Sequence, residues 1–225
     1  MLNAFQTSGA GVPYEGVFNP ALVLLSIAVA IMAAFIALSF ASRIAAATTR
    51  SARWGWTLGG AFSMGGGIWS MHFIGMLAFS LPCGVHYDPL VMILSMIPGV
   101  LASGVALRLV SNGDGNMLRL LGGAVLMGAG IGAMHYAGMG ATQPEVALLR
   151  YRPDFVIASV VVAIALAFVS VAIRHPLRRY AASDKMANAI AAPVMGCAVA
   201  AMHYTAMKAA VFLPEGVASA PAALL

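Results

Sequence analysis

The sequence predicts an all-α membrane protein in which six transmembrane helices form three tandem two-helix repeats. The repeats are expected to build a pseudo-threefold bundle with both termini outside (N-out/C-out). Only 8% of the 225 residues are charged and 61% are hydrophobic, whereas a soluble domain carries roughly 25% charged residues. Apolar runs of about 20 residues, the length that crosses a bilayer core about 30 Å thick, recur along the chain. A histidine motif also recurs three times at nearly constant spacing.

Turn-forming stretches such as PCGVHYDP and SNGDGN separate the predicted helices. The odd-numbered helices open with Pro20, Pro89 and Pro153, and proline is tolerated there because the first-turn N–H has no helical partner. Asn19 and Asp88 stand directly before two of these prolines and are candidate N-caps. The predicted helices span residues 20–40, 57–81, 89–110, 120–142, 153–173 and 187–212.

These helices predict one membrane domain with short flanking segments. No basic signal-peptide region precedes Pro20, so the first helix is expected to direct insertion itself. Cys83 lies in a predicted loop and Cys197 in the middle of a helix, so we expect no disulfide between them. The expected parts are an extracytoplasmic segment 1–19, a membrane domain 20–213 with repeats at 20–81, 89–142 and 153–212, and an extracytoplasmic tail 214–225.

The basic residues predict the orientation, because cytoplasmic loops carry an excess of Lys and Arg. Nine of the twelve basic residues lie in the loops after the first, third and fifth helices. They are Arg43, Arg50, Arg53, Arg108, Arg119, Arg174, Arg178, Arg179 and Lys185. The opposite side holds Arg150, Arg152 and Lys208. The net charge of +5 therefore reflects orientation in the bilayer, and no nucleic acid is expected as a partner.

The three even-numbered helices share one motif. It reads MGGGIWSMHFIGM at residues 64–76, MGAGIGAMHYAGM at 127–139 and MGCAVAAMHYTAM at 195–207. Each copy has, relative to its histidine, Met eight before, Gly seven before, Met one before, an aromatic residue directly after and Met four after. The three histidines are His72, His135 and His203.

The motif spacing predicts where its side chains point. Each histidine lies about fifteen residues, or roughly 22 Å, into its helix, so all three should share one level in the outer half of the membrane. Residues i and i+4 lie on one helix face, so each histidine should point the same way as the methionine that follows it. The motif glycines fall on that face two turns deeper, where small residues let helices pack closely. They are Gly65, Gly128 and Gly196.

Imidazole and thioether groups without a carboxylate form a soft ligand set that favours copper over magnesium, calcium or zinc. We therefore predict copper, as Cu+ or Cu2+, as the cofactor. The candidate ligands are Met71, His72, Met76, Met134, His135, Met139, Met202, His203 and Met207. Methionine stripes are often only core packing, and we favour packing for Met64, Met127 and Met195. An ionisable group inside a membrane helix, however, indicates function by default. The aromatic residues Phe73, Tyr136 and Tyr204 are expected to pack around the site.

The residues MHYT at 202–205, with MHYA at 134–137 and MHFI at 71–74, resemble the MHYT domain, a family of bacterial membrane sensor modules built from three two-helix repeats. The resemblance covers about residues 15–213. It implies a multi-pass protein of the bacterial inner membrane that binds copper through the motif Met and His residues near the outer face. It also implies a diatomic gas ligand (oxygen, carbon monoxide or nitric oxide) and a cytoplasmic effector domain or protein. The first copy departs from the family pattern, with Phe73 in place of tyrosine.

We therefore expect a non-enzymatic sensory domain, embedded in the lipid bilayer, that binds copper, senses copper or a diatomic gas, and signals to an effector. No nucleotide-binding loop or nucleophile arrangement is present in the sequence. Three alternatives stay open: a copper transporter or delivery protein, a haem protein with two of the histidines as axial ligands, and a membrane anchor that dimerises a partner. Copper flux into liposomes would indicate transport, and a Soret band would indicate haem. Replacement of His135 and His203 by alanine without loss of metal or signalling would indicate an anchor.

Overall fold

The computed structural model describes residues 12–111, 117–145, 147–180 and 183–214, and within these ranges the chain forms long helices joined by short strands. The helices are α1 (Pro20–Ala46), α2 (Arg50–Ala78), α3 (Pro89–Leu94), α4 (Met96–Ser111), α5 (Met117–Met139), α6 (Pro153–Tyr180) and α7 (Asp184–Met207). The strands are β1 (Val17–Phe18), β2 (Phe79–Ser80), β3 (Val85–Tyr87), β4 (Thr142–Pro144), β5 (Ala147–Tyr151) and β6 (Ala210–Pro214). The expected tail, from residue 215 on, lies outside the described residues.

The predicted N-caps are confirmed. The Asn19 side chain accepts hydrogen bonds from the backbone N–H groups of Ala21 and Leu22, and Asp88 does the same for the first turn of α3. These side chains satisfy N–H groups that have no acceptor within the helix. The third predicted helix is interrupted, because Pro98 lacks an N–H and its ring crowds the carbonyl of Leu94. α3 and α4 are therefore two pieces of one span, Pro89–Ser111.

Five spans in the described chain are long and apolar enough to cross a membrane. They are Pro20–Ala46, Pro89–Ser111, Met117–Met139, Pro153–Ile173 and Asp184–Met207. α2 has 29 residues, but its many glycines and polar side chains make it less apolar, so a sixth crossing remains a prediction. The outer helices expose large apolar side chains, such as Leu24 (68%), Leu101 (65%) and Ile157 (65%). Lipid is the solvent that such a surface requires.

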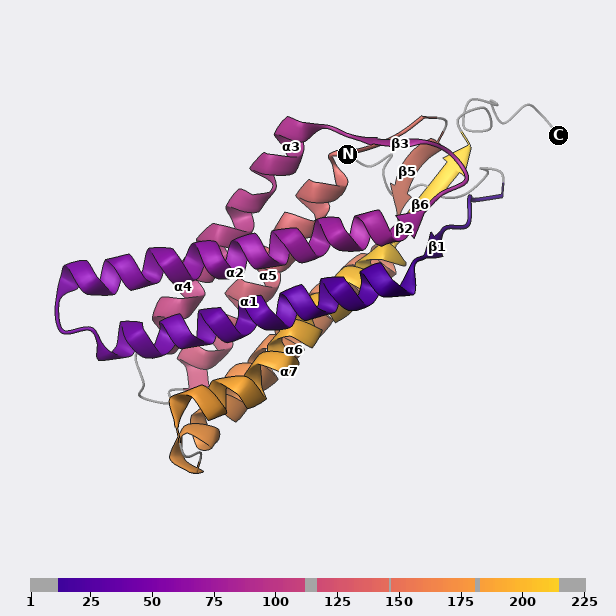
Figure 1. Cartoon of the computed structure of the whole chain (residues 1–225). Coiled ribbons are helices and arrows are strands. Elements are labelled where there is room, and N and C mark those ends of the chain that lie inside the picture. Colours follow the sequence, from indigo (N-terminus) through magenta and orange to yellow (C-terminus); the bar gives the residue numbers. More distant parts are fainter. Residues whose placement is uncertain (1–11, 112–116, 146, 181–182, 215–225) are drawn as a thin grey trace.

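The prediction of helix at the ends of the even-numbered segments was wrong. Residues 79–80, 142 and 210–212 are strand, and the helices before them end at Ala78, Met139 and Met207. The strands pair as β1 with β2, β3 with β4, and β5 with β6, each pair antiparallel. Each repeat is therefore strand, helix, helix, strand, and its two strands close on each other at one end of the bundle (Figure 1). Aromatic and branched residues at these ends favour strand pairing over another helical turn.

The helices form a closed ring in the order α1, α2, α4, α5, α6, α7 and back to α1. Helices α2, α5 and α7, which carry the motif, also contact one another. Each motif glycine lies against the first helix of another repeat: a Cβ on Gly65, Gly128 or Gly196 would overlap the backbone region of a residue there. These partners are Val100, Ile164 and Ile31, respectively. Each partner lies eleven residues after the proline that opens its helical segment, so the three contacts are equivalent.

Candidate metal centre

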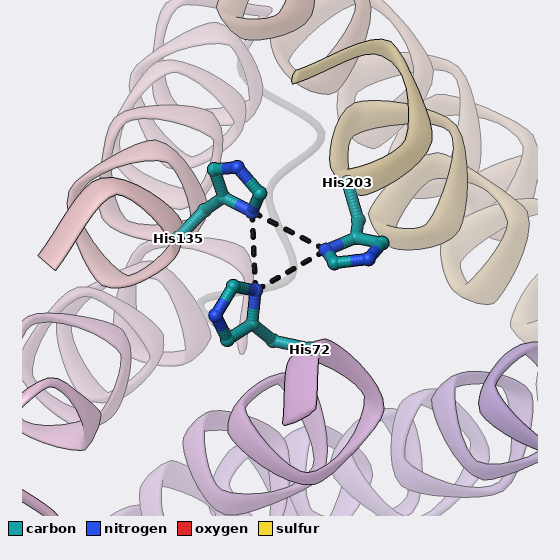
Figure 2. A group of neighbouring side chains, drawn as sticks. All are labelled: His72, His135 and His203. Carbon is teal, nitrogen blue, oxygen red and sulfur yellow. Dashed lines mark hydrogen bonds between the residues drawn. The ribbon is translucent and has the colours of Figure 1, made fainter. Parts of the chain in front are cut away.

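The three motif histidines meet at the centre of the bundle, one each from α2, α5 and α7 (Figure 2). Their exposed fractions are 0% for His72, 1% for His135 and 1% for His203. The Nδ1 atoms form a nearly equilateral triangle with edges of 3.2 Å (His72–His203), 3.1 Å (His135–His72) and 3.2 Å (His203–His135). Histidines that are 63 and 68 residues apart in the chain thus present one convergent set of nitrogen atoms.

Small residues three positions after the histidines make room for this triangle. A Cβ on Gly138 would overlap Nε2 of His72, and a Cβ on Gly75 would overlap Nε2 of His203. The third copy has Ala206 at this position, fully buried. In two of the three copies, therefore, the imidazole of one helix fits against glycine on the next. The sequence reading did not identify these glycines, although their shared spacing from the histidine was visible.

Hydrogen bonding alone cannot satisfy the histidine triangle. A neutral imidazole nitrogen carries either a hydrogen or a lone pair, so an Nδ1 that donates cannot also accept. A ring of three donor–acceptor contacts therefore cannot close. The Nε2 atoms of all three histidines are also buried without a hydrogen-bond partner among the described residues. A cation would satisfy the three Nδ1 lone pairs, which are directed at a common point, and each histidine would then carry its proton on Nε2.

The triangle has dimensions that suit a metal ion. With edges of 3.1 to 3.2 Å, its centre lies about 1.8 Å from each nitrogen. Imidazole nitrogen binds metals such as zinc at about 2.0 Å. His72, His135 and His203 are therefore close enough together to hold one metal ion between them.

The motif methionines lie in two buried layers. Those directly before the histidines belong to the large inner core, together with Met64, Met127 and Met195. Those four residues after the histidines belong to a second cluster, which packs against the strands and includes Phe212 and Ala147. The inner set is Met71, Met134 and Met202, and the outer set is Met76, Met139 and Met207. By position along the helices, the imidazoles thus lie between two layers that contain thioethers.

Aromatic side chains surround the histidines with the same threefold pattern. Phe73, Tyr136 and Tyr204 each contact the histidine before them edge-on, at centroid distances of 4.7, 4.9 and 4.8 Å. Each also meets an aromatic residue that ends a strand of another repeat: Tyr87 for Phe73, Tyr151 for Tyr136 and Phe18 for Tyr204. The sequence reading missed these partners. Their signal was an aromatic residue two positions before each helix-opening proline.

The tyrosine hydroxyls are held by serines on the outer helices. Tyr204 shares a hydrogen bond of 2.7 Å with Ser26, and Tyr136 one of 3.0 Å with Ser159. Both serines, like Ser95, lie six residues after the opening proline. All three serines donate to the carbonyl three residues before them, so the hydroxyls of Tyr204 and Tyr136 donate to Ser26 and Ser159. Phe73 has no hydroxyl to offer to Ser95.

The strand tyrosines stay neutral. Burial raises the pKa of Tyr87, and burial together with neighbouring Tyr136 raises the pKa of Tyr151. Both phenols therefore keep their protons at neutral pH.

The remaining candidate side chains lie apart from the centre. His86 lies on strand β3 and contacts Glu145 at 2.8 Å; Glu145 follows the paired strand β4. Both side chains are exposed. Cys83 and Cys197 are both free thiols, as expected. Among the described residues, the one group of histidine, cysteine and carboxylate side chains spaced for a metal is His72, His135 and His203.

Comparison with known proteins agrees with this architecture. The MHYT family, described as a bacterial signalling protein N-terminal repeat, matches residues 65–123 and 128–183. The chain is 44% identical over 199 residues to MucR of Pseudomonas aeruginosa, a bifunctional diguanylate cyclase/cyclic di-GMP phosphodiesterase, covering 87% of this chain and 28% of that protein. It is 37% identical over 201 residues to the cyclic di-GMP phosphodiesterase NbdA of the same organism (88% and 25%). It is 35% identical over 197 residues to the signaling protein YkoW of Bacillus subtilis (87% and 24%).

The chain thus spans about a quarter of the length of the curated relatives it matches. No solved structure matches it. The two family matches together cover half of the chain, and they include His72 of α2 and His135 of α5. The chain therefore belongs to the MHYT family of bacterial signalling proteins.

Proposed function

We propose that this chain is the membrane-embedded sensory part of a signalling protein and that it binds one copper ion through His72, His135 and His203. The Nδ1 triangle carries the proposal, because its lone pairs converge at one buried point that no hydrogen-bond pattern satisfies. The imidazole and thioether ligands are neutral, so they do not compensate the charge of a bound metal ion. A monovalent Cu+ costs less to place there than Cu2+.

The methionine layers supply the softness of the proposed site. The motif methionines of both adjacent layers would offer thioether ligands in addition to the three imidazoles. Thioether sulfur favours Cu+ over harder metals. Copper bound there would supply a redox-active centre with a coordination position that a diatomic gas can compete for.

The proposed membrane arrangement has six crossings, with the turn between α1 and α2 in the cytoplasm. The described basic residues at that end include Arg43, Arg50, Arg53 and Arg108, as cytoplasmic loops require. The histidine centre then lies in the outer half of the bilayer of the bacterial inner membrane. The strand pairs lie on the extracytoplasmic side.

Signalling follows from how the histidines are seated. Because the imidazoles of His72 and His203 rest against Gly138 and Gly75 of neighbouring motif helices, any change in the triangle moves the helices against each other. A ligand drives such a change only if it binds two packings with different affinity. The proposed receiver is a cytoplasmic effector; the relatives MucR and NbdA are named as cyclic di-GMP enzymes, which supports an enzyme in that role. The chain itself matches only the sensory part of these relatives, so we assign it no catalysis.

Metal analysis of purified protein tests the proposal. We expect about one copper per chain in protein prepared without added metal, and loss of most of it in His72→Ala, His135→Ala and His203→Ala. His86→Ala is the matched control, because His86 is exposed and lies apart from the triangle. Full copper content in the three motif variants would rule out the site.

Copper transport is the second candidate, and one observation favours it. Met64, Met127 and Met195 line a single apolar cavity of about 30 Å³ in the inner half of the bundle, which would give soft ligands below the histidine site. Copper flux into liposomes, lost in Met127→Leu, would support transport.

The geometry disfavours haem, because axial ligands stand on opposite faces of the macrocycle, whereas these three nitrogen atoms lie within 3.2 Å of one another.

A further inference from the structure

A cavity lined by arginines lies at the basic end of the bundle, far from the histidines and separate from the apolar cavity described above. It has a volume of about 530 Å³ and is formed by the turn between α1 and α2, the first turn of α2 and the end of α4. Arg50 is 22 residues before His72 on α2, which places the two about 33 Å apart along the helix. The cavity and the histidine centre are therefore separate sites.

The charged side chains lining this cavity are all arginines: Arg50, Arg53 and Arg108. Among the described residues, no carboxylate forms an ion pair with any of them. The guanidinium of Arg108 is held over the Trp54 ring at 3.6 Å, and its Nε is buried without a hydrogen-bond partner. Three like charges around one cavity repel each other, and a buried unpaired donor is costly. Both costs fall when an anion enters.

The uncharged lining completes a set of hydrogen-bond donors. Thr48 and Thr49 contribute hydroxyl groups, whereas the hydroxyl of Ser111 already donates to the carbonyl of Arg108. α2 begins at Arg50, so the positive end of its dipole lies here, together with the first-turn N–H groups other than that of Ala52, which donates to the Thr49 side chain. Buried Ile44 forms the apolar part of the wall.

The donor set matches a phosphate group. Guanidinium groups bind phosphate oxygens in a bidentate manner, and Arg is preferred over Lys wherever that geometry matters. Helix N-termini bind the same group through backbone N–H donors. Three arginines and a helix N-terminus also offer more positive charge and more donors than a single carboxylate ligand would need. In the proposed orientation this cavity lies at the level of the cytoplasmic headgroups, where anionic lipids attract basic side chains.

The geometry points to a phosphate-binding site formed by Arg50, Arg53 and Arg108 at the cytoplasmic end of the first repeat. The phosphate belongs either to the headgroup of an anionic phospholipid or to a soluble phosphate compound. In either case, occupancy draws the start of α2 and the end of α4 together, since each contributes charge to the same anion.

Native mass spectrometry of the full chain in detergent micelles tests the site with two probes, phosphatidylglycerol and inorganic pyrophosphate. Phosphatidylcholine with the same acyl chains serves as the neutral reference lipid. We expect Arg108→Gln to lower retention of the bound probe at least about tenfold, which corresponds to loss of one buried charged hydrogen bond. Arg50→Gln changes an exposed residue and should also lower retention of the bound probe. It replaces Arg108→Gln as the test if that variant does not fold.

Arg43→Gln is the matched control. Arg43 lies in the last turn of α1, at the same end of the bundle, and stacks over Trp56 at 4.8 Å, but it does not line the cavity. Retention of phosphatidylglycerol that pyrophosphate does not displace identifies a lipid site, and saturable binding of pyrophosphate identifies a soluble ligand. Equal behaviour of Arg108→Gln and Arg43→Gln with both probes overturns the proposal. Copper content should be unchanged in Arg108→Gln, so this test and that of the histidine site fail independently.

Discussion

At the scale of single residues, the centre depends on glycines whose missing side chains make space for imidazole rings. Gly75 and Gly138 each lie where a Cβ would overlap an Nε2 atom. Packed interiors do not accommodate such additions without displacing atoms. The glycines, and not the histidines alone, therefore determine how closely the three rings approach.

Gly138→Ala should displace the His72 ring, lower the free energy of unfolding by about 1–3 kcal/mol and reduce copper retention. Gly66→Ala is the matched control, because a Cβ at Gly66 meets nothing within 4 Å. Thermal unfolding and metal analysis of both variants in the same detergent check the prediction. Equal copper content and stability in the two variants would show that the glycine has no steric role.

The tyrosine–serine bonds around the centre should be measurable as pairwise couplings. Tyr204→Phe should lower the free energy of unfolding by about 1 kcal/mol, because its hydroxyl bonds Ser26 in a partly buried place. Adding Ser26→Ala to Tyr204→Phe should then cost less than Ser26→Ala alone, as a double-mutant cycle reveals for interacting groups. If the effects of the two substitutions on the free energy of unfolding were strictly additive, the Tyr204–Ser26 hydrogen bond would be contradicted.

At the scale of elements, the repeats are joined by glycine contacts between a motif helix and the first helix of another repeat. Gly196 on α7 lies against Ile31 on α1, which closes the ring between the last repeat and the first. A Cβ at Gly196 would come within 2.6 Å of backbone atoms of Ile31. Backbone cannot yield as a flexible side chain can, so these contacts set the spacing of the helices.

Gly196→Ala should therefore loosen the α1–α7 contact and destabilise the domain by about 1–3 kcal/mol. Gly122→Ala, on α5, is the comparison, since nothing lies within 4 Å of a Cβ there. Denaturation of both variants in one detergent measures the difference. A variant at Gly196 as stable as that at Gly122 would mean that the ring closes by other contacts.

Sequence reasoning predicted the helical repeats, the two N-caps and the convergence of His72, His135 and His203, because these follow from period and spacing along one helix. It missed contacts that only form between repeats. The strand pairs depend on residues about 60 positions apart, such as Phe18 and Phe79. The fit of His72 against Gly138 likewise needs the relative rotation of two helices. Helical periodicity contains no information about either.

At the scale of the whole molecule, the two proposed sites lie at different levels of one bundle. The histidine centre is near the strand pairs, and the arginine cavity is at the opposite end of α2. The ring of helices connects them, because α2 and α4 pack along each other and both contribute to the arginine cavity. In the proposed orientation, a change at the histidine centre would thus reach the cytoplasmic end of the bundle through α2.

The proposed orientation can be tested with the natural thiol at Cys83, which lies in the β2–β3 loop and is partly exposed. A membrane-impermeant maleimide should label Cys83 in spheroplasts with intact membranes. In a background without natural cysteines, Ser51→Cys, at the exposed start of α2, should be labelled only after permeabilisation. The reverse pattern would invert the topology and place the histidine centre in the inner half of the bilayer.

X-ray absorption at the copper edge of the purified protein tests the central claim most directly. Convergence of the three Nδ1 atoms on one ion predicts about three nitrogen neighbours at about 2.0 Å, with imidazole scattering at longer distance. Removal of one imidazole in His135→Ala should lower the nitrogen count or abolish the signal. A first shell made only of sulfur, or a nitrogen shell that is unchanged in His135→Ala, would contradict a metal centre built by the histidine triangle.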